Sequence, residues 1–298
     1  MTAPEPPRDR TPVGTPARAG GTPTVGLLHP GEMGAMVGLT LRAGGARVLW
    51  ASESRSASSR ARAAEVGLED GGLLAAVAAA SSVIVSVVPP HGALALAREV
   101  AARGFRGTYV DANAVAPATA REIGRVVEAA GARFVDGGII GPAGRRPGTT
   151  RLYLSGPGAL DVARLFEAGP IEAIVLDAPV GAASALKMAY AGWNKGSQAL
   201  LAAIRAYARA EEVEEALLAE WKISMPDLPA RSDRAVADNL GKAWRFVGEM
   251  EEIARALAAA GLPTGFHEAA REIYRRLADE RRQGCVESVA LTRWRSRP

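Results

Sequence analysis

The pattern of hydrophobic and polar positions divides the chain into two parts. From residue 24 to about residue 179, short runs rich in β-branched residues alternate with alanine-rich stretches of helical periodicity. This alternation predicts crossover units and a largely parallel sheet, with helices such as those at 33–42 and 117–130 between the strands. Strands are expected at residues 24–28, 46–51, 83–88, 107–112, 132–137, 151–155 and 172–176.

The second part carries no strand pattern. Residues 181–210 read as one long helix, and further helices are expected on either side of the proline- and glycine-containing breaks at 224–229 and 261–265. The fold class predicted is therefore an α/β Rossmann-type N-terminal domain followed by an all-α C-terminal domain. A cleft between the two is the natural place for a substrate.

The ends of the chain differ from the body. The first 22 residues are rich in Pro, Thr, Arg and Gly and contain no apolar run, which predicts a disordered extension and not a secretory signal. We therefore divide the chain into an extension (1–22), a Rossmann-type domain (23–179), an all-helical domain (180–284) and a basic tail (285–298).

Composition excludes several classes of function. A net charge of +4 without a basic patch in the body argues against a nucleic-acid partner. No apolar run reaches the length of a membrane span. Cys285 is the lone cysteine and the three histidines are scattered, so we expect a cytoplasmic protein without a metal site.

Residues 24–52 have the outline of a strand, a glycine turn, a helix and a second strand. Gly31 and Gly34 keep the spacing of the last two glycines of G-x-G-x-x-G, where one lets a pyrophosphate approach and the other lets the helix pack on the strand. The first glycine is replaced by His29, for which a hydrogen-bonded structural role is favoured over lining the cofactor. An ordinary strand-to-helix turn is the alternative to a dinucleotide site. The residues expected at the cofactor are His29, Pro30, Gly31, Glu32 and Met33.

The end of the second strand indicates which nucleotide is bound. An NAD site usually has an acidic residue there, but this chain has Ser52, followed by Arg55 and Arg60. Hydroxyl and guanidinium groups suit a 2′-phosphate, so NADP (NADPH) is the expected cofactor. If Glu53 faces the ribose instead, NAD is expected, and a solvated serine-rich loop is the third possibility.

Several motifs, taken in order, resemble those of the 6-phosphogluconate and β-hydroxyacid dehydrogenase superfamily. GLLHPGEMG (26–34) is similar to the family's G-x-x-G-x-G-x-M-G, and VVPP (87–90) resembles its V-P motif. DANAVAP (111–117) resembles D-x-S-T-x-x-P, and DGGIIGP (136–142) resembles the substrate-loop motif. PGTTRLYLSG (147–156) is similar to the G-T-L strand that follows. The HPGEMG turn also resembles a branch of the superfamily with a phosphogluconate-dehydrogenase-like C-terminal domain.

The resemblance extends over residues 24–261 and implies a role for particular positions. It places Lys187 at the family's general acid/base, and a lysine desolvated in a cleft suits proton transfer to or from a carbinol oxygen. A snorkelling surface lysine is the alternative. The resemblance further implies cofactor contacts at Val88, Pro89 and Asn113, and substrate contacts at Ile139, Ile140 and Gly141.

Other family positions are altered here. The asparagine that follows the family lysine is Ala191, and Asn194 is the candidate to replace it in binding the substrate. Ile140 stands where the substrate loop has serine, and Glu249 aligns with the acid of a lysine–aspartate pair. An unfamiliar substrate is therefore expected. Ile139, Ile140, Trp193 and Met225 suggest a more apolar pocket, with a place in the core as the alternative for each.

The resulting hypothesis is an NADP-dependent oxidoreductase that transfers hydride between nicotinamide and a small carbonyl or hydroxy compound. An imine reductase of the same fold and a non-catalytic NADP-binding regulatory protein are the alternatives. A homodimer is expected, because the resemblance implies pairing through the helical domain, in which residues 240–262 are amphipathic.

Overall fold

The computed structural model describes residues 22–282, except for the side chains of residues 236, 238–240 and 280–282. The remainder of the predicted extension, the basic tail and Cys285 lie outside the described residues. Within them, no helix is both long and apolar enough to cross a membrane.

An eight-stranded sheet with the order β3-β2-β1-β4-β5-β6-β7-β8 forms the first half of the molecule. Every neighbouring pair is parallel except β6 and β7, which are antiparallel. The strands are β1 (Thr24–Leu28), β2 (Arg47–Trp50), β3 (Glu69–Asp70), β4 (Val83–Ser86), β5 (Thr108–Asp111), β6 (Arg133–Ile140), β7 (Thr150–Ser155) and β8 (Ile171–Val175).

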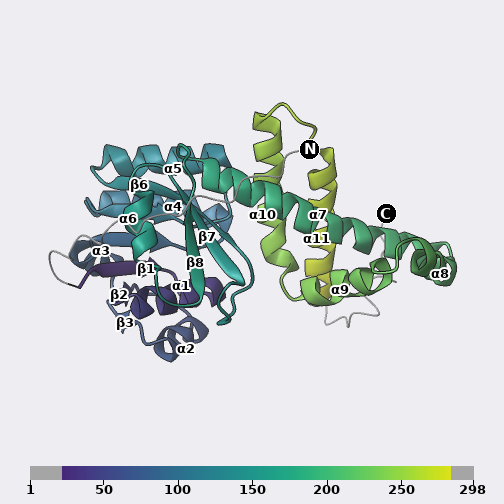
Figure 1. The fold of residues 1–298 in the computed structure, drawn as a ribbon, viewed down its shortest axis with the longest axis horizontal. Coiled ribbons are helices and arrows are strands. Elements are labelled where there is room, and N and C mark those ends of the chain that lie inside the picture. The colour runs from purple at the N-terminus through teal and green to yellow at the C-terminus, as the bar shows by residue number, and fades with distance from the viewer. Residues whose placement is uncertain (1–21, 283–298) are drawn as a thin grey trace, which may run out of the picture.

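Helices cover both faces of the sheet (Figure 1). On one face α1, α2 and α6 pack on a buried apolar cluster, and on the other α3, α4 and α5 pack on a second cluster. The helices of this half are α1 (Glu32–Ala43), α2 (Ala57–Glu65), α3 (Leu74–Ala80), α4 (Pro90–Ala102), α5 (Pro117–Ala129) and α6 (Ala159–Arg164). The arrangement is a doubly wound Rossmann-type domain.

The second half is helical and begins with one long helix that runs from the sheet into the second lobe (Figure 1). Its own buried cluster includes Met188 of α7, Met250 and Ile253 of α10, and Tyr274 of α11. The helices are α7 (Ala182–Ala210), α8 (Glu214–Ser224), α9 (Leu228–Leu240), α10 (Ala243–Ala259) and α11 (Gly265–Arg282).

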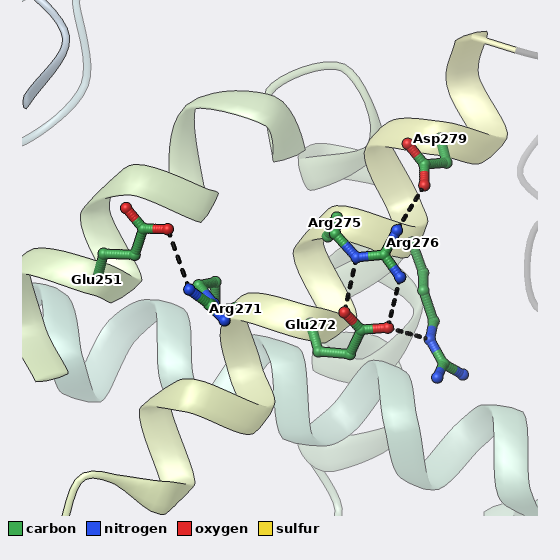
Figure 2. Close-up of polar contacts among 6 residues, drawn as sticks. All are labelled: Glu251, Arg271, Glu272, Arg275, Arg276 and Asp279. Atoms are coloured by element: carbon green, nitrogen blue, oxygen red, sulfur yellow. Dashed lines mark hydrogen bonds and ion pairs between the residues drawn. The ribbon is translucent and has the colours of Figure 1, made fainter. Parts of the chain in front are cut away.

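Polar contacts on α11 lie mostly at the surface (Figure 2). Arg271 pairs with Glu251 of α10 at 3.1 Å, which joins the two helices. Glu272 accepts hydrogen bonds from Arg275 and Arg276, and these bonds lower the pKa of Glu272 to about 2. Exposed pairs of this kind contribute little to stability each, so the packing of α10 on α11 rests chiefly on the buried apolar cluster.

A carboxylate of the helical half joins the two lobes. Glu252 of α10 is buried, and its Oε2 accepts hydrogen bonds from the Ala116 N–H at 2.6 Å and from the Thr119 hydroxyl at 2.9 Å. Both donors belong to the start of α5, whose first N–H groups have no partner within the helix. Arg255 donates to the other oxygen of Glu252 at 2.6 Å. The first turn of a sheet-covering helix is therefore completed by the other half of the chain.

The predicted fold class is confirmed. The expected strands agree with the observed ones within one or two residues at most ends, and the long helix begins one residue later than expected, at Ala182. Strand β6 runs on to Ile140, and the two-residue strand β3 was not expected. A strand this short carries no periodicity that a sequence pattern can reveal.

Candidate functional site

A cavity of about 650 Å³ lies where the carboxyl ends of the strands meet α7 and the start of α10. The sheet order reverses between β1 and β4, and open α/β sheets bind ligands at such a switch point. The lining residues include Gly31, Glu32, Met33, Val88, Pro89, Asn113, Ile139, Gly141, Lys187, Asn194, Lys195, Lys242, Trp244, Arg245, Phe246 and Glu249.

The glycine turn after β1 brings backbone groups to this cavity. A Cβ atom on Gly34 would lie 2.0 Å from the carbonyl oxygen of His29, so only glycine allows α1 to pack this closely on the turn. A Cβ atom on Gly31 would meet nothing within 4 Å, which leaves open space beside the N-terminus of α1. The free N–H groups of that first turn and the helix dipole suit a phosphate group.

One ring nitrogen of His29 lacks the hydrogen bond expected of a structural histidine. Its Nδ1 is buried and has no hydrogen-bond partner within the described part of the chain. Burial first, and then the positive charge of Arg55, lower the pKa of His29 to about 4, so the ring is neutral at pH 7. The turn therefore presents a neutral imidazole whose nitrogen is unused, a residue that could bond a ligand.

A carboxylate that sequence reasoning did not find lies beside the end of β2. The Ser52 hydroxyl hydrogen-bonds Asp70 at the end of β3, and this bond is the first cause of the lowered pKa of Asp70. Arg60 also lies 3.5 Å from Asp70 and donates to the Ser52 carbonyl oxygen at 2.9 Å. Asp70 is thus already hydrogen-bonded by Ser52, the serine expected at the ribose, and it also pairs with Arg60.

Two further guanidinium groups lie toward the glycine turn. Arg62 of α2 donates to the carbonyl oxygen of Pro30 at 3.1 Å, and Arg55 is close enough to act on the charge of His29. Sequence reasoning missed Arg62, because only the folded helix α2 brings it back to a turn 32 residues earlier. Glu53, which would have favoured NAD, is exposed.

Asn113 is fixed at the cavity by three neighbours. Its side-chain oxygen accepts from the Val88 N–H at 2.6 Å, and its amide donates to the Ser86 hydroxyl at 2.9 Å and to Asp111. Asp111 is fully buried, and burial together with the nearby charge of Asp136 raises its pKa to about 8. The V-P segment and the Asn113 segment are therefore held together by a buried polar cluster.

Lys187 reaches the cavity from the first turns of α7. A Cβ atom on Gly138 would lie 2.6 Å from the Ala183 carbonyl oxygen and 3.0 Å from Cβ of Lys187, so glycine in β6 allows the close approach of this helix. Asp136 accepts hydrogen bonds from the Gly181 N–H at 2.9 Å and from the Ser184 N–H at 3.1 Å. Two residues of the substrate-loop motif thus position the helix that carries the lysine.

The surroundings of Lys187 favour the loss of its proton. Burial, and next the positive charge of Lys195, lower its pKa to about 8, while Glu249 opposes the change. No hydrogen bond or ion pair of its ammonium group is found within the described residues. A lysine in this state can both donate and accept a proton near neutral pH.

The aligned acid Glu249 has a partner on α7. It pairs with Lys195 at 2.6 Å, and each side chain is only 14% exposed. The Lys195 ammonium also lies 4.8 Å from the centre of the Phe246 ring. A lysine and an acid are therefore both present at the cavity, as expected for this pair. The lysine lies on α7, however, whereas the alignment places both members of the pair on α10.

Some expected residues do not reach the cavity. Ile140 is buried and does not line it, because successive side chains of β6 point to opposite faces and Ile139 takes the cavity side. Trp193 is 73% exposed and Met225 47% exposed, so neither is a wall of an apolar pocket. His29, Pro30, Ser52 and Arg55 lie along the turn and the end of β2, outside the lining itself.

Within the described residues, no group of three His, Cys, Asp or Glu side chains is arranged to hold a metal ion. The cavity offers a half-buried lysine, an ion pair and the free N–H groups of a glycine turn.

Comparison with known proteins supports the same reading of the fold. Residues 208–277 match a family described as a domain of unknown function, DUF1932. No curated protein matches the chain.

Many solved structures are similar over most of the chain, among them the following three. The conserved protein MTH1747 of unknown function, described as structurally similar to 3-hydroxyacid dehydrogenases, is 29% identical over 88% of this chain and 100% of its own, with a TM-score of 0.63. Mycobacterium tuberculosis 3-hydroxyisobutyrate dehydrogenase is 18% identical over 92% and 100% of the two chains, with a TM-score of 0.66. An Aspergillus terreus reductive aminase solved with NADPH is 22% identical over 91% and 99%, with a TM-score of 0.54.

Proposed function

We propose that this chain is a member of the β-hydroxyacid dehydrogenase-like superfamily and an NADP-dependent oxidoreductase that interconverts a small carbonyl compound and its alcohol. The observation that carries the proposal is the position of Lys187, a lysine with a lowered pKa, in the cavity that the glycine turn also lines. The similarity of the fold to dehydrogenases supports it.

The residues present fit a nicotinamide nucleotide. The open space at Gly31 and the free N–H groups of α1 would hold the pyrophosphate, and the unused Nδ1 of His29 offers a further bond at the turn. Val88 and Asn113 would lie beside the nicotinamide end, since both line the cavity near Lys187. A bound nicotinamide nucleotide supplies or accepts the hydride.

NADP is favoured over NAD by the charges at the end of β2. Arg60 contacts this end, and Arg55 and Arg62 lie toward the adjoining glycine turn, whereas Asp70 is already hydrogen-bonded by Ser52 and pairs with Arg60. Guanidinium groups pair with a 2′-phosphate through charge-assisted bonds. Both nucleotides occur among the similar structures, NADPH in the reductive aminase and NAD+ in an imine reductase variant, so the preference rests on the arginines.

Lys187 would move the proton of the substrate oxygen. In the direction of reduction, its ammonium donates a proton to the oxygen of the carbonyl group, and in the direction of oxidation the neutral amine accepts the proton of the hydroxyl group. Asp136 and Gly138 orient the start of α7.

An imine reductase is the second candidate, supported by the similar folds of imine reductases and of the reductive aminase. A substrate panel separates the candidates: NADPH oxidation is followed with aldehydes, ketones, keto acids and cyclic imines, using wild type and Lys187→Met. Carbonyl turnover that Lys187→Met abolishes supports the proposal. Turnover of imines alone favours the second candidate, and NADPH binding without turnover of any compound favours a non-catalytic role.

We also propose that the protein is a homodimer joined through α7. Helix α10 is not the proposed interface, because its apolar face is buried within this chain. Large apolar side chains recur on α7 at intervals of three, four and seven residues and are 38–73% exposed. A stripe with this spacing is self-complementary across a two-fold axis. Its members are Tyr190, Trp193, Leu200, Ile204 and Tyr207.

A further inference from the structure

Lysine is rare in this chain, and it is concentrated at the cavity. It occurs at four positions among 36 lysine and arginine residues. Lys187, Lys195 and Lys242 line the cavity, and Lys222 is exposed on α8. Arginine, the usual basic residue of this chain, contributes Arg245 to the lining.

The two basic side chains differ in a way that bears on this distribution. A guanidinium group is planar and keeps its proton at any pH at which a protein is folded, whereas an ammonium group is a compact charge that loses its proton when it is desolvated. This chain uses arginine almost everywhere else. At the cavity it uses lysine, whose charge is small and can be lost by titration.

Lys195 is the most firmly held of these lysines. Its ammonium is 2.6 Å from a carboxylate oxygen of Glu249 and 4.8 Å from the centre of the Phe246 ring, so α10 fixes it from two sides. The Tyr274 hydroxyl donates to the Lys195 carbonyl oxygen at 2.8 Å, which ties the backbone at the same point to α11. In most other ion pairs of the described residues, at least one side chain is much more exposed than the 14% found for Lys195 and Glu249.

The pair acts electrostatically on Lys187, two helical turns earlier on the same helix. The positive charge of Lys195 lowers the pKa of Lys187, and the negative charge of Glu249 raises it. A charge held at a fixed position in a partly desolvated cavity acts more strongly than one on a mobile surface side chain. The other charged or titratable side chains around the cavity are Glu32 on α1, Lys242 before α10 and Arg245 on α10, with Asp111 and Asp136 buried in the sheet beneath.

We propose that Lys195 and Glu249 are positioning residues for Lys187: their ion pair holds a second ammonium group at a fixed place in the cavity and thereby governs the charge that Lys187 carries. The role rests on the proposed function of Lys187 as the proton-transfer group. It assigns a purpose to two residues that need not touch the reacting atoms.

The experiment measures the titration of Lys187 directly and needs neither cofactor nor substrate. The four lysines are labelled by reductive ¹³C-methylation of the full-length protein, and their resonances are followed by NMR from pH 6 to pH 11. Loss of one signal in Lys187→Met assigns it. With so few lysines in the chain, the spectrum holds few other resonances.

Substitutions of opposite charge are expected to move the Lys187 midpoint in opposite directions. Lys195→Met removes a positive charge and should raise the midpoint by on the order of one pH unit, and Glu249→Gln should lower it by a similar amount. Lys195→Arg keeps the charge and the ion pair and should restore a midpoint close to that of wild type. Lys222→Met, on the exposed face of α8, is the matched control and should change nothing.

A midpoint that stays unchanged in both Lys195→Met and Glu249→Gln overturns the proposal, and so does movement in the same direction in both. Thermal unfolding of each variant checks that it is folded. If Lys195→Met or Glu249→Gln does not fold, the midpoint of the variant that does fold is compared with that of Lys195→Arg, and this comparison decides the result. Failure of the proposed function would appear separately, as an absence of redox turnover in wild type.

Discussion

Asp136 and Ser184 are joined by two hydrogen bonds: the serine hydroxyl donates to Oδ1 at 2.6 Å and the serine N–H donates to Oδ2 at 3.1 Å. Ser184 lies in the first turn of α7, and Lys187 is one turn further along. The carboxylate in the interior of β6 thus fixes the start of the helix that carries the proposed acid/base.

Replacing Asp136 by Ala should therefore destabilise the protein. Four donors would lose a buried acceptor, from Ser155, Gly181 and Ser184 (twice). A loss of about 3 kcal/mol in the free energy of unfolding is expected, because each buried donor left without a partner costs about 1–3 kcal/mol before relaxation. Urea unfolding measures it, with exposed Asp161→Ala as the matched control. An equal effect of the two substitutions would contradict this role.

The pH dependence of turnover should report Lys187. Its pKa is lowered to about 8, and the protonated form, which donates in reduction, predominates below that value. Carbonyl reduction should therefore decline as the pH rises through about 8, and alcohol oxidation should increase over the same range. Lys187→Met should reduce turnover by about 10²–10⁴-fold and remove this dependence, while NADPH binding persists. Steady-state rates from pH 6 to pH 10 give the profile, and an unaltered profile in the variant would exclude Lys187 as the titrating group.

Asp111 makes stability depend on pH. Its pKa is raised to about 8 in the folded protein, above the value near 4 of an unfolded aspartate, so between these values the folded state binds more protons. Stability should therefore fall as the pH rises through this range. Asp111→Asn still offers Asn113 an acceptor and should raise the melting temperature by a few degrees at pH 8.5 and by less at pH 5. A variant that is destabilised equally at both pH values would argue against a protonated Asp111.

Arg55 should discriminate between the two nucleotides. Arg55→Gln removes a guanidinium group from the region where a 2′-phosphate is expected and should weaken NADPH binding by about tenfold or more while leaving NADH binding nearly unchanged. Fluorescence titration with both nucleotides measures the ratio of the dissociation constants. Arg98→Gln, an exposed arginine on α4, serves as control. An equal loss for NADH would mean that Arg55 contacts a part that both nucleotides share.

The apolar stripe on α7 predicts how subunits associate. Trp193→Glu places a charge in its middle, and the protein should then elute as a monomer in size-exclusion chromatography with light scattering, where wild type is dimeric. Ile223→Glu tests an equally exposed apolar residue on α8 outside the stripe and should leave the dimer intact. If wild type is itself a monomer at micromolar concentration, the stripe has another purpose.

The fold could be predicted from the sequence because its strands and helices follow from hydrophobic periodicity within short segments. β-branched runs, alanine-rich helices and the glycine turn each occupy a continuous segment, so strand and helix positions follow from short windows. The cavity residues Val88, Asn113 and Lys187 could also be predicted, because they belong to motifs that follow one another along the chain in the same order as in the superfamily. Ile140, by contrast, was assigned to the substrate although the strand continues through it, and alternation turns it away.

Contacts between distant segments could not be predicted in this way. Asp70 reaches Ser52 only once β2 and β3 pair, and Lys195 meets Glu249 only once α10 packs on α7. The scarcity of lysine, however, is visible in the sequence itself. Comparing the positions of the four lysines with those of the arginines would have drawn attention to Lys195 and Lys242.

The hydrogen bonds of Glu252 bear on how such a protein can change over evolutionary time. Because α5 borrows the acceptor for its first turn from α10, the nucleotide-binding half is not a module that can be exchanged freely. A recombinant joining this half to a foreign helical half would leave the Ala116 N–H and the Thr119 hydroxyl without their acceptor.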